Sequence, residues 1–123
     1  MRVILDTHIA LWVFSADKRV DPIQNLILSE ETEVFVSVAS LWELAIKIGL
    51  GKIEADLGEI RWAIVESGFT ELMVKGAHTE ALLQLPPYHK DPFDRMLIAQ
   101  SITNKYPIMT DDDKIKLYGC QIV

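Results

Sequence analysis

The sequence has little cysteine and no long apolar run. Cys120 is its single cysteine, so no disulfide can form within the chain, and such sparing use is typical of a reducing compartment. No stretch approaches the roughly 18 consecutive apolar residues of a membrane-spanning helix. Asp6 interrupts the apolar N-terminal run too early for a signal peptide. We therefore expect a cytoplasmic protein with no membrane segment and no structural disulfide.

An excess of positive charge is also missing. The chain carries 12 Lys and Arg against 18 Asp and Glu, which gives a net charge of −6. This balance argues against the broad basic surface of a non-specific nucleic-acid binder. It does not exclude a nucleic-acid enzyme, because divalent cations invert the local sign of an acidic pocket.

Repeats, low-complexity tracts and linker-like stretches are absent as well. The 123 residues fit one compact domain, and 50% of them are hydrophobic, which is enough to build a core without disulfides. We expect a single domain over residues 1–123.

Strand-like and helix-like segments alternate along the chain. The patterns predict strands over 2–5, 33–37, 69–74 and 107–110, with a further edge strand over 121–123. They predict helices over 9–14, 23–29, 40–49, 57–67, 77–85, 92–104 and 113–117. This alternation predicts an α/β fold in which helices flank both faces of a mostly parallel central sheet.

Three of the predicted helices have recognisable starts. Asp21-Pro22 and Asp91-Pro92 each combine a favoured N-cap residue with proline at the first helical position. Ser40 and Glu43 match the S-x-x-E capping box. We therefore expect these helices to begin at or just after the capping residues.

Acidic residues gather at one edge of this predicted sheet. Asp6 directly follows the first strand, and Asp111 and Asp112 directly follow the fourth. Glu43 and Asp94 lie near the starts of helices that face the same edge. Ligands of open α/β sheets bind at the carboxyl ends of the strands, and an all-carboxylate cluster favours Mg²⁺ or Mn²⁺. Spacing alone does not choose between Asp111 and Asp112.

Each acid also has a structural explanation. Asp6 could cap the following helix, and Glu43 could complete a capping box or pair with Lys47 one turn later. Asp94 could complement the helix dipole. These explanations account for the acids one at a time, but not for their common location.

Four segments resemble the signature segments of PIN-domain ribonucleases. They are especially similar to those of the VapC-type toxins of prokaryotic toxin–antitoxin pairs, and they span nearly the whole chain in order. The segments are LDTHIALW (5–12), SLWELAIKIGLGKI (40–53), HKDPFDRMLIAQ (89–100) and IMTDDDKIKLYG (108–119).

The resemblance implies which acids form the site. It assigns catalysis to Asp6, Glu43, Asp94 and Asp112. The family's terminal pattern of Thr or Ser, any residue, then Asp matches Thr110–Asp112 and so selects Asp112 as the fourth acid. Asp6, Asp94 and Asp112 would hold the metal, while Glu43 would hold a second metal or orient the water. Thr110, Thr7 and Asp111 would support the site.

The resemblance also implies a function and partners. We expect a Mg²⁺- or Mn²⁺-dependent endoribonuclease that leaves a 5′-phosphate and a 3′-hydroxyl. Its candidate RNA contacts are Lys47, Arg95 and Lys52. A homodimer is expected, as is inhibition by an antitoxin lying across a helical groove that residues 9–14, 41–48 and 60–65 would form.

Other interpretations remain open from the sequence. A non-catalytic PIN-type binding module is one alternative, and a Mg²⁺-binding receiver domain of two-component signalling is a weaker one, since no aspartate follows the strand over 33–37. We interpret His8 and His89 as surface or structural residues. The tryptophans at 12, 42 and 62 are expected in the core or at an interface.

Overall fold

The computed structural model describes residues 1–120. Within them, four strands form one sheet in the order β3-β2-β1-β4, and every neighbouring pair is parallel. The strands are β1 (Arg2–Leu5), β2 (Glu33–Ser37), β3 (Thr70–Leu72) and β4 (Ile108–Met109). The predicted parallel α/β fold is confirmed, while the strand predicted over 121–123 lies outside the described residues.

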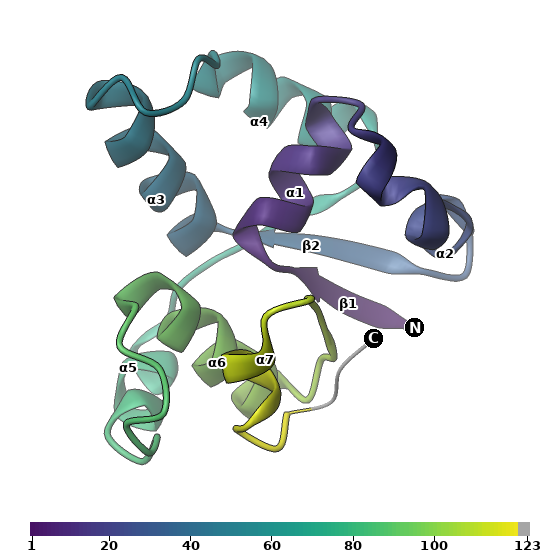
Figure 1. Ribbon diagram of the computed structural model, residues 1–123. Helices are drawn as coiled ribbons and strands as arrows, with labels where there is room; N and C mark the ends of the chain where they lie inside the picture. Colours follow the sequence, from purple (N-terminus) through teal and green to yellow (C-terminus); the bar gives the residue numbers. More distant parts are fainter. Residues whose placement is uncertain (121–123) are drawn as a thin grey trace.

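Helices cover both faces of the sheet (Figure 1). One face carries α1 (Thr7–Phe14), the 3₁₀ helix η1 (Lys18–Ile23), α2 (Gln24–Leu28), α3 (Val38–Gly49) and α4 (Leu57–Glu66). The other face carries α6 (Pro92–Asn104) and α7 (Asp113–Lys116), and α5 (Gly76–Leu82) packs against α6.

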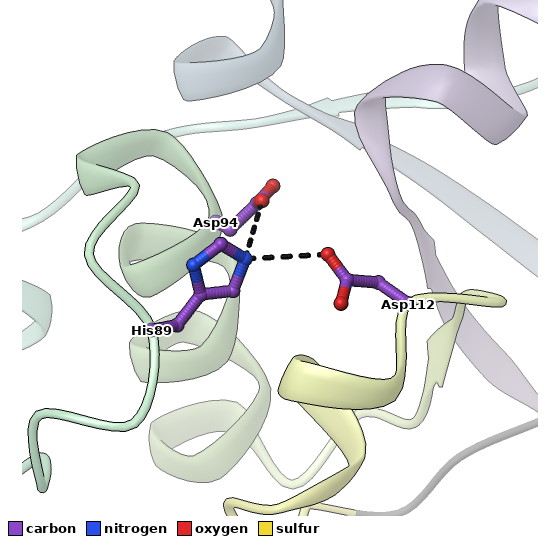
Figure 2. Close-up of side chains that lie close together, drawn as sticks. All are labelled: His89, Asp94 and Asp112. Atoms are coloured by element: carbon purple, nitrogen blue, oxygen red, sulfur yellow. Dashed lines mark hydrogen bonds and ion pairs between the residues drawn. The ribbon is translucent and has the colours of Figure 1, made fainter.

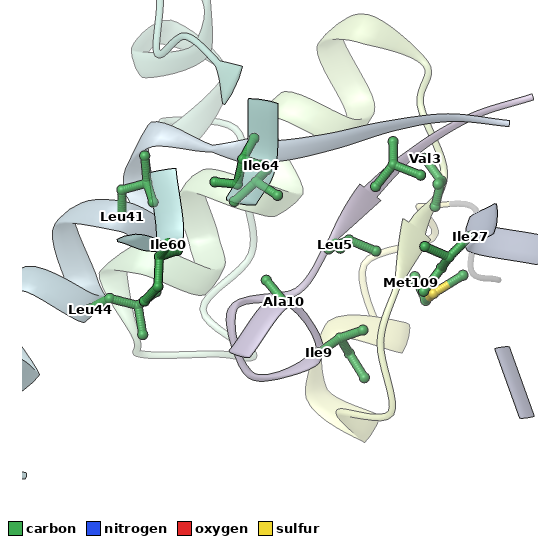
Figure 3. Packing of buried hydrophobic residues seen from close by; sticks show 12 residues of the cluster. Val3, Leu5, Ile9, Ala10, Ile27, Leu41, Leu44, Ile60, Ile64 and Met109 are labelled. Atoms are coloured by element: carbon green, nitrogen blue, oxygen red, sulfur yellow. The ribbon is translucent and has the colours of Figure 1, made fainter. Parts of the chain in front are cut away.

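Alternate residues of β1 build the two halves of the core. Val3 and Leu5 pack on the side of α1 to α4, in the cluster of Figure 3. Ile4 points the other way, into a cluster that includes Leu97 and Ile98 of α6. All three β1 side chains have no exposed surface, as expected for a strand buried on both faces.

The start of α3 differs from the prediction. Ser37, the last residue of β2, is the N-cap, because its hydroxyl accepts a hydrogen bond from the Ala39 N–H at 3.1 Å. Ser40 lies inside the helix, fully buried, and its hydroxyl accepts a hydrogen bond from Thr7 at 2.8 Å. The predicted Ser40–Glu43 capping box is therefore wrong, and Ser40 instead joins α3 to α1.

The two Asp-Pro signals have different outcomes. Asp91 caps α6 as predicted, accepting from the N–H groups of Phe93 and Asp94 at 2.8 and 2.9 Å. Asp21-Pro22 does not begin a helix, because both residues lie inside η1. Asp17 caps η1 through the Arg19 N–H, so that turn forms earlier and α2 begins only at Gln24.

Two of the three tryptophans are too exposed to be core residues. Trp42 and Trp62 are 63% and 66% exposed, so the core interpretation is wrong for both and only the interface interpretation remains. Trp12 is half-buried beneath the Arg19 guanidinium, whose carbon lies 4.2 Å from the ring centroid. Among residues 1–120, no helix combines the length and hydropathy needed to span a bilayer.

The strand order creates a crevice beside β1. The chain leaves β1 toward α1 on one face, and it leaves the neighbouring β4 toward α7 on the other. Ligands of parallel sheets bind at such a switch point. The Asp6 N–H donates to the Met109 carbonyl at 3.0 Å, so the residues after both strands enter this crevice side by side.

Candidate functional site

Asp6 is buried at the end of β1 and caps α1. Its Oδ1 accepts from the Thr7 N–H at 2.7 Å, and its Oδ2 accepts from the Thr110 hydroxyl at 2.6 Å. Burial raises its pKa above the usual 3.8, although Thr110, His8 and Thr7 oppose that shift. The capping role and the site role therefore belong to the same carboxylate.

Thr110 connects the ends of β1 and β4. Besides donating to Asp6, its oxygen accepts from the Asp112 N–H at 3.0 Å, which fixes the turn that follows β4. Asp112 then caps α7, with its Oδ1 accepting from the Lys114 N–H at 2.8 Å. Burial works against ionisation of Asp112, but the hydrogen bonds from Lys114 and His89 outweigh it and lower its pKa.

Glu43 projects from α3 and is only 7% exposed. Its Oε2 accepts from the Lys47 ammonium at 2.8 Å, as expected for an i,i+4 pair. This hydrogen bond raises the pKa of Lys47. The other oxygen, Oε1, is buried without a hydrogen-bond partner among residues 1–120. A buried carboxylate oxygen without a partner is costly, so a ligand at this position would be stabilising.

Asp94 lies in the first turn of α6 and shares a cavity of about 230 Å³ with Asp6 and Glu43. Thr7, Lys47 and Asp91 also line this cavity. Burial raises the pKa of Asp94 to about 7. The negative charges of Asp6, Asp91 and Glu43 act in the same direction, and His89 opposes them.

His89 is a site residue that the sequence interpretation missed. Figure 2 shows its ring between Asp94 and Asp112. Its Nε2 lies 2.9 Å from Asp94 Oδ2 and 3.2 Å from Asp112 Oδ2. The three side chains place ligand-type atoms within 4.8 Å of one another. Asp112 thus joins the other acids through Asp94 and His89.

Asp111 has a different location from Asp112. Its carboxylate, with a side chain 63% exposed, contacts Nε2 of His8, while Nδ1 of His8 lies 3.3 Å from Asp6 Oδ2. His8 therefore sits between the two carboxylates at the mouth of the crevice. Of the three consecutive aspartates, the structure directs Asp112 toward Asp94 and Asp111 toward His8.

The candidate RNA contacts occupy three different environments. Lys47 reaches the cavity, with 42% of its side chain exposed, and Lys52 is exposed in the turn after α3. Arg95 is half-buried and donates to carbonyl oxygens of the segment before α6, including those of Pro86 and His89 at 2.9 and 3.2 Å. Its guanidinium stabilises that segment rather than facing the cavity.

Comparison with known proteins identifies the fold family. The sequence model of the PIN domain matches residues 3–119. The chain belongs to the PIN domain family. The PIN domain family includes nucleases, and in this chain acidic residues follow β1 and β4.

Solved structures resemble this PIN domain at low sequence identity. One match is a chain of VapBC2 from Rickettsia felis, in a crystal structure of VapBC2 bound to a DNA fragment from its promoter. It has a TM-score of 0.74 and 16% identity, and the match covers 99% of this chain and 96% of that one. A chain of FitAB bound to an IR36 DNA fragment has a TM-score of 0.70 and 15% identity, and the match covers 98% of this chain and 93% of that one. The PIN domain endonuclease Utp24 gives 0.54 and 19%, covering 94% and 74%. No curated protein sequence matches the chain significantly.

The donor set of this PIN domain fits a hard divalent cation. Asp6, Glu43 and Asp94 line the cavity from separate parts of the fold, and Glu43 also has a buried oxygen, Oε1, without a partner among residues 1–120. Mg²⁺ and Mn²⁺ prefer such oxygen ligands. A cation would also offset the mutual repulsion that helps raise the pKa of Asp94.

We predict that Asp94→Asn stabilises the metal-free protein at neutral to basic pH. The folded-state pKa of about 7 lies above the ordinary 3.8, so the folded protein retains a proton that the unfolded chain releases. The contribution of the Asp94 carboxyl to stability is fully present below its unfolded-state pKa and is lost as the pH rises through its folded-state pKa. In EDTA, the gain of the variant in urea unfolding should therefore grow from about pH 4 and level off above about pH 7.

Asp113→Asn is the matched control, because the Asp113 side chain is 96% exposed. It should follow the wild-type pH profile. An Asp94→Asn profile parallel to wild type would contradict the prediction.

Proposed function

We propose that this PIN domain is a metal-dependent endoribonuclease that acts in the cytoplasm as the toxin of a toxin–antitoxin pair. The observation that carries this proposal is the convergence of Asp6, Glu43 and Asp94 on one cavity, with Asp112 joined to Asp94 through His89. Membership of the PIN domain family supports nuclease chemistry. The fold shared with chains of VapBC2 and FitAB supports the toxin assignment.

In this proposal Asp6, Asp94 and Asp112 hold Mg²⁺ or Mn²⁺. Glu43 faces the same cavity and orients the attacking water or holds a second ion. A bound cation would lower the pKa of that water and neutralise charge on the scissile phosphate. Thr110 and Thr7 keep Asp6 in place through the hydrogen bonds described above. The products are a 5′-phosphate and a 3′-hydroxyl.

Lys47 is the best placed of the three candidate RNA contacts. Its ammonium lies at the cavity beside Glu43 and remains partly exposed, so it can meet a phosphate that approaches the acids. Lys52 extends the positive charge along the turn after α3. Arg95 suits this role less well, since its donors already serve backbone carbonyls.

Cleavage of a mixed pool of structured and single-stranded RNA tests the proposal. We expect cutting with Mg²⁺ or Mn²⁺, no cutting with EDTA, and a loss of at least about 100-fold in Asp94→Asn, because removing a residue that orients or charges a metal site typically costs that order of rate. The cleaved ends should carry the products named above. Sequencing the fragments would then identify the preferred site.

Asp113→Asn, purified in the same way, is the control for contaminating nuclease and should cut like wild type. Equal cutting by wild type and Asp94→Asn would contradict the proposal. Metal binding without any cutting would favour a non-catalytic PIN binding module.

The groove between α1 and α4 is the proposed antitoxin site. It encloses about 590 Å³, and Leu11, Phe14, Ile60 and Trp62 form its apolar wall. Glu54, Asp56 and Glu59 add negative charge to it. An antitoxin helix with an apolar face and basic flanks would complement both features.

A second apolar surface, around Trp42, is the proposed homodimer contact. It encloses about 430 Å³ between α3 and α6 and is lined by Val38, Trp42, Phe93 and Met96 among others, with almost no polar atoms. The Trp42 ring packs edge-on against Phe93 at 5.1 Å between centroids. Apolar side chains gathered at the surface in this way mark protein interfaces.

The two tryptophans provide a matched pair of tests. Trp42→Glu should shift the homodimer to monomer in analytical ultracentrifugation and leave antitoxin binding intact. Trp62→Glu should weaken binding of the cognate antitoxin by at least about 10-fold, since aromatic anchors dominate interface energies, and leave the dimer intact. Both side chains are exposed, so neither charge should unfold the protein. An unchanged oligomer in Trp42→Glu, or unchanged antitoxin affinity in Trp62→Glu, would contradict the corresponding assignment.

A further inference from the structure

His89 is buried at the acidic site, where it lies between Asp94 and Asp112 but has no assigned chemical role. The residue is 9% exposed. Its Nε2 lies 3.2 Å from Asp112 Oδ2, within hydrogen-bond distance, and 2.9 Å from Asp94 Oδ2. A histidine between two metal-binding acids is either a ligand itself or a hydrogen-bond donor that positions them.

The surroundings of the other ring nitrogen distinguish these roles. The Asp91 N–H points at Nδ1 of His89, 3.3 Å away. A nitrogen that faces an N–H group must present its lone pair, so the ring proton belongs on Nε2, facing Asp94 and Asp112. A histidine that binds a metal through Nε2 needs the opposite arrangement, with its proton on Nδ1 facing an acceptor.

The backbone of His89 is fixed from two further directions. Its N–H donates to the Tyr118 hydroxyl at 2.7 Å, and that hydroxyl donates to the Pro86 carbonyl at 2.7 Å. The Arg95 guanidinium bonds both the Pro86 and His89 carbonyls and the Tyr118 hydroxyl. The ring therefore reaches the acids from a segment that α6 and Tyr118 hold in place.

The contact determines which acid oxygens remain for a ligand. Each Asp112 oxygen accepts one hydrogen bond, Oδ1 from the Lys114 N–H and Oδ2 from His89, and each keeps a second lone pair for a ligand. Asp94 uses Oδ2 for the His89 contact, which leaves its Oδ1 for a ligand in the cavity that it lines with Glu43.

We propose that His89 is a positioning residue whose Nε2–H group joins Asp112 to Asp94 and presents Asp94 to the metal, without binding the metal itself. The proposal rests on the proposed function only in taking Asp94 as a metal-holding residue. It makes no use of RNA cleavage.

The first test reads the position of the ring proton in the wild-type protein. In ¹⁵N-histidine-labelled protein, long-range ¹H–¹⁵N spectra distinguish protonated from unprotonated ring nitrogens. His89 should show a protonated Nε2 and an unprotonated Nδ1 both in EDTA and at saturating Mg²⁺. Transfer of the proton to Nδ1 on adding Mg²⁺ would overturn the proposal and make His89 a ligand.

His78 is an internal control for these spectra. Its Nδ1 accepts from the Lys75 N–H at 2.9 Å, and its Nε2 faces the Asn104 side-chain oxygen at 3.0 Å. This residue lies on α5, contacts the end of α6 through Asn104 and does not line the acidic cavity. Its spectrum should show the same tautomer as His89 and should not change with Mg²⁺.

The second test measures Mn²⁺ binding by electron paramagnetic resonance of the free ion. His89→Leu removes the donor at similar side-chain size and should weaken Mn²⁺ binding about 10- to 100-fold, the usual cost of losing a residue that orients metal ligands. His89→Gln keeps an N–H donor and should recover part of that loss. Wild-type affinity in His89→Leu would overturn the proposal, and so would equal losses in the two variants.

Both tests are independent of the nuclease assay. Metal binding with the expected tautomer and variant affinities, but without RNA cleavage, would support this inference and contradict the nuclease proposal alone. RNA cleavage accompanied by wild-type Mn²⁺ affinity in folded His89→Leu would contradict this inference alone.

Discussion

The repulsion between carboxylates in a partly buried crevice is the constraint on which the rest of the site depends. Asp6, Glu43 and Asp94 share one small cavity, and like charges at close range disfavour one another's ionised forms. A neighbouring donor offsets each of these charges: Thr110 at Asp6, Lys47 at Glu43 and His89 beside Asp94. The fold therefore supplies partial compensation from three segments of the chain, and a divalent cation would supply the remainder. For the proposed nuclease, such an arrangement would let an acidic chain approach a polyanion, because a bound cation inverts the local sign of the charge.

Most of the fold could be predicted because its signals are local. Buried strands read as short apolar runs, and the Asp91-Pro92 cap marked the start of α6 correctly. The errors arose where two residues competed for one cap. Ser37 precedes Ser40 and accepts from the Ala39 N–H, and Asp17 precedes Asp21 and accepts from the Arg19 N–H. Each helix therefore begins before the predicted cap. The exposure of Trp42 could not be predicted, because helical periodicity says that a face is apolar but not whether the same chain covers it.

The common location of the acidic residues could be predicted from the sequence, but the hydrogen bonds that join them could not. Strand ends and helix starts are local features, and they placed Asp6, Glu43, Asp94 and the pair Asp111-Asp112 at one edge of the sheet. The resemblance to PIN-domain toxins then selected Asp112. The role of His89 depends on the approach of the segment before α6 to α7, which no spacing in the sequence encodes. Its position two residues before the Asp91 cap was the only available signal. Arg95 carried a charge that suggested RNA, yet it satisfies carbonyls of a segment without regular secondary structure, as buried backbone requires.

The hydrogen bond between Thr110 and Asp6 joins residues 104 positions apart. Closing so long a loop costs conformational entropy, and the contact requires nearly the whole chain. During synthesis, β4 cannot pair with β1, and Asp112 cannot join the other acids, until the chain has emerged beyond Asp112. A nascent fragment that ends before β4 carries Asp6, Glu43 and Asp94 but lacks Asp112 and the Thr110 hydroxyl that donates to Asp6. For the proposed nuclease, this connectivity would delay activity on the ribosome and protect the messenger RNA from its own unfinished product.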